Sequence, residues 1–411
     1  MSNRLSRRNF IRMGLVGMTG SKFYKNSPKA FQGQESLKIK EYRVLGRTGM
    51  RVSDVSLGAG VPQDPALVSY VIDKGVNYLD TAEGYSRGQS EKVIGQAIKG
   101  RRKEVFITTK LGVRKNHTEK QLLDRFRNCL ERLQTDYVDV LMFHNPKDTE
   151  TLTLPAFHKT FQKLKADGKV RFSGLSCHEP AMAEICNFAI NDGRFDVLLL
   201  VYNFMQEKAA EILKYASQKQ VGITIMKVHA GEHPEQLRSI PPEEQQRLQD
   251  EADRGTLQFQ KKYNLSEKEY FGAAMRWVLQ NKDVGCVVMS IRNFEQADDY
   301  ISSSGIKFAE NDRKLLAWKA LDRQSVYCRH ACGDCQRFCP HGVAINDVLR
   351  MDTYFTNYRE EKFALMQYAE LEESQKPMAC TSCAGQCEKY CPFNLPVRKR
   401  LISAQNRLTL T

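Results

Sequence analysis

The sequence predicts an α/β protein, a closed (β/α)8 TIM barrel followed by a small C-terminal domain. Between about residues 42 and 310, short apolar runs alternate with amphipathic stretches of about ten to twenty residues. This alternation is typical of repeated β-α units. Beyond that region, eight of the twelve cysteines gather in two runs, which indicates a second, cysteine-rich domain. We expect the barrel at residues 36–321 and the second domain at 322–411.

Eight apolar runs are candidate barrel strands, and they lie at residues 55–57, 77–80, 105–110, 138–144, 171–176, 197–202, 222–226 and 285–289. The segments between them have helical periodicity. In the segment 119–133, for example, Leu122, Phe126, Leu130 and Leu133 mark one helical face. Eight strands with intervening helices over this length predict a closed barrel. A small hairpin, 42–45 with 51–52, is expected before the first barrel strand.

Polar residues stand where three successive predicted strands end. Asp80, Lys110 and His144 end the second, third and fourth strands, and Tyr85 lies in the loop after Asp80. In a TIM barrel the chemistry gathers at these C-terminal strand ends. We expect Tyr85 to supply a proton to a carbonyl oxygen, with its pKa lowered by the Lys110 ammonium. Asp80 would hold Lys110, and His144 would orient the substrate.

The two cysteine runs are Cys328-x3-Cys332-x2-Cys335-x3-Cys339-Pro340 and Cys380-x2-Cys383-x3-Cys387-x3-Cys391-Pro392. A [4Fe–4S] cubane needs four converging thiolates, and in two-cluster ferredoxins the cysteine before the proline ligates the other cluster. The expected ligand sets are therefore Cys328, Cys332, Cys335 and Cys391 for one cluster, and Cys380, Cys383, Cys387 and Cys339 for the other. Structural zinc and disulfides are the alternatives. The paired Cys-Pro endings and the full complement of eight ligands favour clusters.

The formal charge of +14 is concentrated at the N-terminus. Residues 1–40 hold nine Lys or Arg and one acidic residue, which leaves 53 basic against 47 acidic residues beyond them. No basic stripe with interleaved aromatics is present in the sequence, so nucleic acid is not an expected partner.

The segment Ser6-Arg7-Arg8-Asn9-Phe10-Ile11-Arg12, followed by a weakly apolar stretch over 13–19, resembles a twin-arginine export leader. The stretch is too short for a permanent membrane span. The alternative is a disordered basic arm. We expect a signal and linker over residues 1–35, the twin-arginine export machinery as a partner, and a periplasmic location, with a cytoplasmic one as the alternative.

Four segments in the expected order resemble the aldo-keto reductase family over about residues 42–310: Asp80-Thr-Ala-Glu83-Gly-Tyr85, Thr109-Lys110-Leu-Gly112, Phe143-His144-Asn145-Pro146 and Ser173-Gly174-Leu175-Ser176. The resemblance implies a catalytic tetrad of Asp80, Tyr85, Lys110 and His144, with NADP(H) or NAD(H) across the barrel mouth. The segment 290–296 resembles the family's phosphate-binding segment. The implied cofactor contacts are Ser176, Met226, Lys227, Ser290, Arg292 and Gln296.

With its cysteine runs, the chain resembles a bacterial branch of this family that carries a C-terminal ferredoxin-like α+β/α iron-sulfur domain. The expected function is nicotinamide-dependent reduction of an aldehyde or ketone, or the reverse oxidation of an alcohol or sugar. Two 4Fe-4S clusters would relay single electrons to a possible redox partner protein. The alternative is an iron-sulfur electron-transfer protein whose inactive barrel is a docking scaffold. Cys177-His178 and Met226 replace the usual nicotinamide anchors and favour that alternative, whereas the intact tetrad opposes it.

Overall fold

The computed structural model describes residues 37–60, 64–231, 267–323, 327–358 and 360–409. Leu37–Thr411 form one compact unit. The predicted export leader lies outside the described residues. No helix within the described ranges is long and apolar enough to cross a membrane.

A closed barrel of eight parallel strands, in the order β10-β3-β4-β5-β6-β7-β8-β9, is the centre of this unit. The strands are β3 (Val55–Gly58), β4 (Tyr78–Asp80), β5 (Phe106–Leu111), β6 (Val138–His144), β7 (Val170–Cys177), β8 (Val197–Val201), β9 (Gly222–Met226) and β10 (Cys286–Ser290). All eight predicted strands are confirmed to within one residue at each end. Nearly all positions of these strands are buried, on both faces of the sheet, which explains the nearly continuous apolar runs in the sequence.

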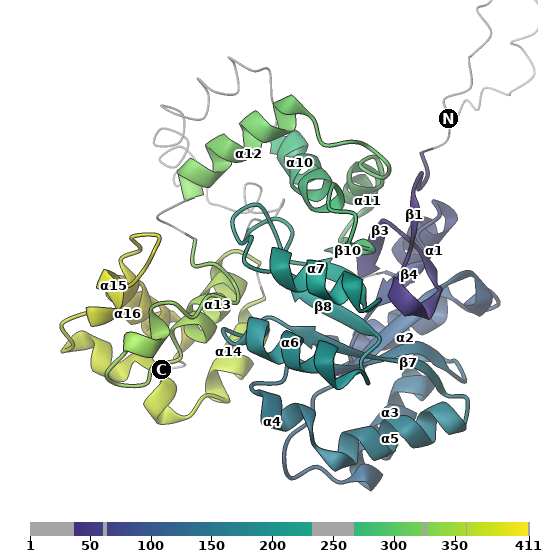
Figure 1. Ribbon diagram of the computed structural model, residues 1–411, viewed down its shortest axis with the longest axis horizontal. Helices are drawn as coiled ribbons and strands as arrows, with labels where there is room; N and C mark the ends of the chain where they lie inside the picture. Colours follow the sequence, from purple (N-terminus) through teal and green to yellow (C-terminus); the bar gives the residue numbers. More distant parts are fainter. Residues whose placement is uncertain (1–36, 61–63, 232–266, 324–326, 359, 410–411) are drawn as a thin grey trace, which may run out of the picture. The chain divides into compact units, whose positions relative to one another are not determined.

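Helices lie outside the ring of strands (Figure 1). They are α1 (Pro65–Asp73), α2 (Gln89–Ala97), α3 (Glu119–Leu133), α4 (Thr149–Leu152), α5 (Pro155–Ala166), α6 (Met182–Asp192), α7 (Ala210–Gln218), α10 (Glu267–Leu279), α11 (Phe294–Ile301) and α12 (Glu310–Arg323). The predicted helix over 119–133 is α3. It begins at a capping box between Thr118 and Gln121, and it buries Leu122, Phe126 and Leu133.

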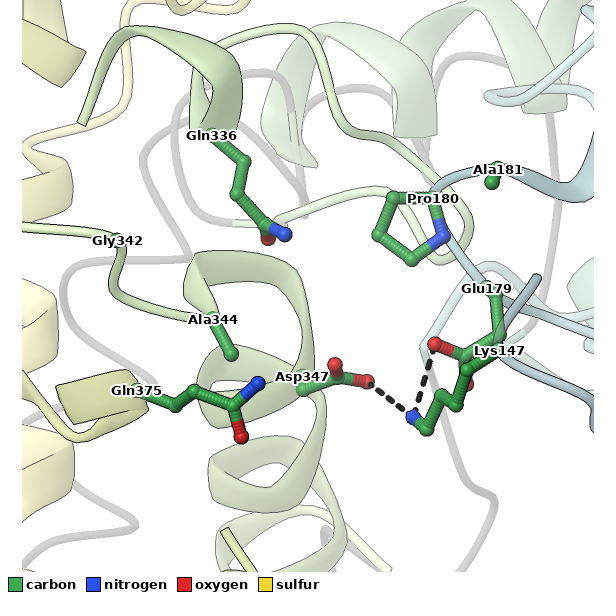
Figure 2. A pocket seen from close by; sticks show the side chains of 9 residues that line it. All are labelled: Lys147, Glu179, Pro180, Ala181, Gln336, Gly342, Ala344, Asp347 and Gln375. Atoms are coloured by element: carbon green, nitrogen blue, oxygen red, sulfur yellow. Dashed lines mark ion pairs between the residues drawn. The ribbon is translucent and has the colours of Figure 1, made fainter. Parts of the chain in front are cut away.

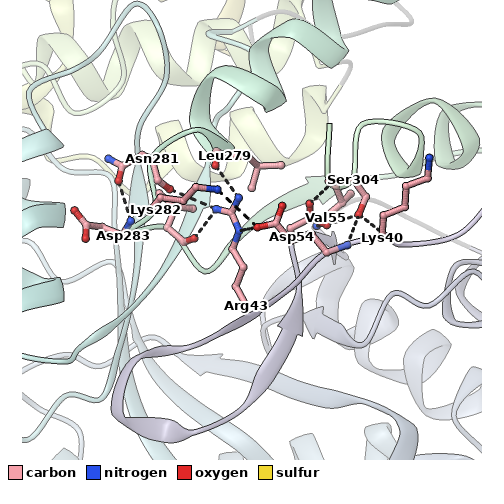
Figure 3. Close-up of polar contacts among 12 residues, drawn as sticks. Lys40, Arg43, Asp54, Val55, Leu279, Asn281, Lys282, Asp283 and Ser304 are labelled. Atoms are coloured by element: carbon pink, nitrogen blue, oxygen red, sulfur yellow. Dashed lines mark hydrogen bonds and ion pairs between the residues drawn. The ribbon is translucent and has the colours of Figure 1, made fainter. Parts of the chain in front are cut away.

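A hairpin of β1 (Tyr42–Val44) and β2 (Arg51–Ser53) closes the N-terminal end of the barrel. Its Leu45 packs against residues that begin barrel strands, such as Tyr78. Gly46 has φ +49°, and a Cβ there would lie 2.3 Å from the backbone nitrogen of Gly222, so only glycine fits this approach. Figure 3 shows polar contacts between this N-terminal region and residues much later in the chain. Arg43 donates to the carbonyl oxygens of Leu279 and Val284 at 2.7 and 2.9 Å.

The C-terminal part consists of α13 (Ile345–Thr356), α14 (Glu361–Ala369), α15 (Gln386–Lys389) and α16 (Val397–Leu408), with short 3-10 turns η4 (Gln336–Phe338), η5 (Glu373–Gln375) and η6 (Pro377–Thr381). Its described residues contain helices and no strand. The expected α+β content was therefore wrong for this part. Between the two cysteine runs, residues 345–369 carry two helices, α13 and α14.

The two cysteine runs are built as a structural repeat. The Gln336 side-chain oxygen accepts a hydrogen bond from the backbone N–H of Asn346 at 3.1 Å, where α13 begins. The Glu388 carboxylate accepts one from the backbone N–H of Arg398 at 2.9 Å, where α16 begins. The Phe338 ring stacks on Tyr390 with 3.6 Å between ring centroids. Each Cys-Pro segment thus leads into a helix in the same way, although this symmetry was not evident from the unequal cysteine spacings.

Candidate functional site

Asp80 and Lys110 form a buried ion pair at the C-terminal ends of β4 and β5. The Lys110 Nζ lies 2.5 Å from Asp80 Oδ1 and donates to the Thr81 carbonyl oxygen at 2.7 Å. Both side chains are almost completely buried. Burial raises the pKa of Asp80 and lowers the pKa of Lys110, and their mutual attraction offsets part of each shift. The pair places a fixed cation beneath the barrel mouth.

Tyr85 and His144 lie above this pair. The Lys110 Nζ is 4.8 Å from the centroid of the Tyr85 ring, and the His144 ring meets Tyr85 edge to face at 5.7 Å. Tyr85 begins the turn η2 (Tyr85–Gly88), whose next two residues both have left-handed backbone conformations, at φ +48° and +56°. Such conformations are costly for residues other than glycine and are often found at functional sites. The four predicted residues therefore come together, and their catalytic roles stay a prediction.

The expected direction of the Tyr85 pKa shift was wrong. Burial raises the pKa of Tyr85 well above its usual value, and the negative charge of Asp80 acts in the same direction. Lys110 does not reverse this, because its ammonium lies over the ring and is paired with Asp80. The hydroxyl consequently stays protonated near neutral pH, which suits a proton donor.

His144 is neutral at this site. Burial, together with the positive charge of Lys110, lowers the pKa of His144 to about 3. A neutral imidazole can donate or accept one hydrogen bond without placing a charge next to the substrate. It is therefore suited to orienting a carbonyl oxygen.

The residues implied as cofactor contacts lie at the ends of three strands. Ser176 is buried in β7, and no described residue bonds its hydroxyl. Met226 ends β9 and Ser290 ends β10. Lys227 and Arg292 follow these two strands directly, in the loops after the seventh and eighth strands of the barrel. Their contact with a cofactor stays a prediction.

Gln296 holds the loop that carries Arg292. Its side-chain oxygen accepts from the backbone N–H of Arg292 at 2.7 Å, and its amide nitrogen donates to the Tyr300 hydroxyl at 3.1 Å. The residue is buried. In this structure Gln296 positions Arg292, and both ends of its amide are engaged within the protein.

Sequence reasoning missed the contribution of the C-terminal part to the barrel mouth. Lys227 donates to the Tyr354 hydroxyl at 2.9 Å. Arg292 donates to the Tyr358 carbonyl oxygen at 3.0 Å and lies 3.6 Å from a Glu360 carboxylate oxygen. These partners are more than 60 residues away in the chain and belong to no motif. The signal in the sequence was the recurrence of charged residues, Asp347, Arg350 and Asp352, within the partly apolar stretch that the structure buries as α13.

A cavity of about 230 Å³ lies beside this junction, between the end of β7 and α13 (Figure 2). Lys147 joins its two sides, at 2.9 Å from Glu179 and 3.7 Å from Asp347. On the α13 side, Arg350 also lies 3.8 Å from Glu179. The contact between barrel and C-terminal part is therefore strongly polar.

The eight predicted cysteine ligands form no disulfides, and they are buried or half-buried. Burial raises the pKa values of Cys328 and Cys335, and Cys391 from the second run raises them further. Cys339 from the first run acts likewise on Cys380 and Cys387 of the second. Cys391 is thus an electrostatic neighbour of the first run and Cys339 of the second, while Cys387 also acts on Cys335. The grouping of the ligands stays a prediction.

The eight cysteines supply the number of thiolates that two [4Fe–4S] cubanes need. Within the described ranges, no three His, Cys, Asp or Glu side chains converge closely enough to hold one metal ion. Hydrogen-bond donors also point at the sulfurs, with Asn346 Nδ2 at 3.6 Å from Cys328 Sγ and the Gly385 N–H donor at 3.4 Å from Cys383 Sγ. Cluster binding by these residues stays a prediction.

Comparison with curated proteins found relatives across the barrel. L-galactose dehydrogenase of Arabidopsis thaliana is 26% identical over 291 residues, which cover 64% of this chain and 88% of that protein. An uncharacterized oxidoreductase of Bacillus subtilis, YqkF, is 27% identical over 197 residues, 44% of this chain and 62% of its own length. A probable voltage-gated potassium channel subunit beta of Oryza sativa subsp. japonica is 38% identical over 126 residues, 26% of this chain and 38% of its own length. The match thus spans less than two thirds of the last two relatives.

Solved structures share the fold. An aldo-keto reductase of Bacillus halodurans in its holo form is 20% identical, with a TM-score of 0.53, over 68% of this chain and 96% of that one. An aldo-keto reductase of Klebsiella pneumoniae in complex with NADPH is also 20% identical, with a TM-score of 0.52, over 69% of this chain and 95% of that one. The model of the aldo/keto reductase family matches residues 62–319, which include the tetrad and end before the cysteine runs. The chain therefore belongs to the aldo/keto reductase family.

Proposed function

We propose that this protein is an oxidoreductase that interconverts an aldehyde or ketone and its alcohol, or oxidises a sugar, with NADP(H) or NAD(H). The observation that carries the proposal is the protonated Tyr85 hydroxyl held next to the Lys110–Asp80 pair and the neutral His144. Membership of the aldo/keto reductase family supports it. The fold shared with the Klebsiella pneumoniae enzyme, whose structure contains NADPH, supports the choice of cofactor class.

The four side chains divide the work of carbonyl reduction. The carbonyl oxygen would lie between the Tyr85 hydroxyl and the His144 imidazole, because these two rings face each other at the mouth. His144 orients that oxygen, and Tyr85 donates the proton as negative charge develops on it. Lys110 stabilises the resulting phenolate, and Asp80 keeps Lys110 in place. When bound, the nicotinamide cofactor supplies the hydride.

The C-terminal cysteines extend the proposal to two 4Fe-4S clusters. The crossed grouping of Cys391 with the first run and of Cys339 with the second supports it. Such clusters would exchange single electrons with a redox partner protein. The Arg7-Arg8 leader supports export by the twin-arginine route to the periplasm, a route that suits a protein folded around its cofactors beforehand.

A second candidate is an iron-sulfur electron-transfer protein whose barrel does not react. A specific observation favours it: Lys227 and Arg292, in the loops after the seventh and eighth strands, are engaged by the chain's own C-terminal residues. If that engagement is permanent, a nucleotide cannot use these two cations. The two candidates differ in whether the barrel binds nucleotide at all.

The proposal is tested by Tyr85→Phe in anaerobically purified protein. We expect carbonyl reduction over a panel of aldehydes and ketones to fall by about 10² to 10⁴-fold, because the variant lacks the acid. NADPH affinity should change little. The matched control is Tyr78→Phe, since Tyr78 begins β4, the strand before the turn that carries Tyr85, and is buried in the barrel interior, where its hydroxyl accepts from Thr108 at 2.7 Å. Equal turnover by Tyr85→Phe and the wild type would show that another group supplies the proton.

A further inference from the structure

Two cations mark one side of the barrel mouth. Lys227 follows the seventh strand, β9, and Arg292 follows the eighth, β10. Arg292 stands just before α11, whose first turn is capped by the side chain of Asn293. In TIM barrels, the loops after strands seven and eight and the N-terminus of a following helix often form a phosphate site. Two cations at this place would suit an anion with several oxygens.

A carboxylate of the chain itself already stands at this place. Glu360 Oε1 lies 3.6 Å from Arg292 Nη2, and its side chain is only 22% exposed. Burial raises the pKa of Glu360, while the positive charges of Lys227 and Arg292 both act to lower it. Glu360 therefore pairs with Arg292, and the charge of Lys227, whose ammonium bonds the Tyr354 hydroxyl of the same segment, acts on the same carboxylate.

Neighbouring residues hold Glu360 in this position. Its backbone N–H donates to the Tyr354 carbonyl oxygen at 3.0 Å, and its own carbonyl oxygen accepts from the N–H of Ala364 in the first turn of α14. The Tyr354 hydroxyl accepts from Lys227 at 2.9 Å, and the Tyr358 ring lies 5.1 Å from the same Nζ. On the barrel side, the Gly231 carbonyl oxygen accepts from Asn357 at 3.2 Å. The segment between the C-terminal end of α13 and the N-terminal end of α14 is therefore held against the barrel by several hydrogen bonds.

We infer that Glu360 is an internal occupant of the barrel's phosphate site, so that a phosphate-bearing nucleotide and the Tyr354–Glu360 segment compete for Lys227 and Arg292. The inference rests on the proposed function for the identity of the ligand, a nicotinamide nucleotide. Its consequence is that the C-terminal part controls cofactor loading. The apparent affinity for nucleotide is reduced by the fraction of molecules in which the segment is seated.

The test is titration with NADPH, followed by the fluorescence of the bound reduced nicotinamide, on anaerobic full-length protein. The variants are the wild type, Glu360→Gln and the control Glu361→Gln, an exposed neighbour in α14. Glutamine keeps the size of the side chain and removes the competing charge. We expect Glu360→Gln to bind NADPH about tenfold or more tightly, which corresponds to about 1.4 kcal/mol. Glu361→Gln should bind as the wild type does.

A second variant weakens the contact of the same segment with the other cation, Lys227. Tyr354→Phe removes the hydroxyl that Lys227 bonds and leaves Glu360 and Arg292 in place, so it should also tighten NADPH binding. This variant decides the question if Glu360→Gln cannot be purified. Measurable and equal affinity in the wild type and both variants would overturn the inference and leave the proposed function standing. Binding of neither NADPH nor NADH in any variant would overturn both and favour the electron-transfer candidate.

Discussion

The two sides of the barrel mouth differ in where their charges find partners. On the side of β4, β5 and β6, Lys110 finds its charged partner within the barrel: it is paired with Asp80, and both are buried. On the side of β9 and β10, Lys227 and Arg292 are engaged by residues of the C-terminal part. The Lys110–Asp80 pair is thus held within the barrel, whereas the cation side depends on a segment more than 60 residues away. Tyr354 and Glu360 of that segment also act to raise the pKa of Tyr85. Disturbing the C-terminal part should therefore alter the second side far more than the first.

The largest effect is expected from removing one crossed cysteine. Cys391→Ala should reduce the iron content of anaerobic protein from about eight to about four per chain, because each cubane needs four thiolates. Cys328→Ala should remove the same cluster, since burial and Cys391 act together on its thiol. Iron and sulfide analysis with electron paramagnetic resonance of the reduced protein checks whether the two variants retain the same signal.

The matched control is Cys129→Ala, at a buried cysteine of α3 in the barrel. Its iron content should equal that of the wild type. If Cys391→Ala instead shared its residual signal with Cys380→Ala, the crossed grouping would be wrong, and each run would hold its own cluster.

A smaller effect is expected from breaking the ion pair on the barrel side. Lys110→Met leaves Asp80 buried without its cation and should lower the free energy of unfolding by about 3–5 kcal/mol. Denaturant unfolding followed by circular dichroism measures it. The exposed pair of Arg101 and Asp73 gives the comparison, since Asp73→Asn should cost about 1 kcal/mol or less. Similar losses in the two variants would mean that the Lys110–Asp80 pair is not buried in solution.

His144 should give this side of the mouth a pH dependence. Its pKa is about 3 in the folded protein against 6.5 in the unfolded chain. Between these values the unfolded chain binds the additional proton, so the contribution is present above pH 6.5 and is lost as pH falls toward 3. The slope is about 1.4 kcal/mol per pH unit. In His144→Asn, the slope of the free energy of unfolding against pH between pH 3 and 6.5 should be smaller by that amount. Equal slopes in the variant and the wild type would indicate that His144 is solvated.

The sequence could predict those features of the molecule that depend on local patterns of residues, and not those that depend on long-range packing. The strands were predictable because each is a short apolar run, and the tetrad because polar residues such as Asp80 end buried strands. The direction of the Tyr85 pKa shift was not, because it depends on Lys110 facing the ring and on burial. The position of Glu360 was not predictable either, since long-range packing of α13 and α14 brings it to Arg292.

The most direct test of the difference between the two sides is hydrogen–deuterium exchange of the anaerobic protein with and without NADPH. The reporters are the backbone amides of Asn357, Tyr358 and Glu360, which donate to Thr353 and Tyr354 carbonyl oxygens at 2.8 to 3.2 Å. NADPH at saturation should speed their exchange, because nucleotide displaces the segment, while the amides of β4 and β5 stay as protected as before. Slower or unchanged exchange at Tyr358 and Glu360 with NADPH demonstrably bound would contradict the account.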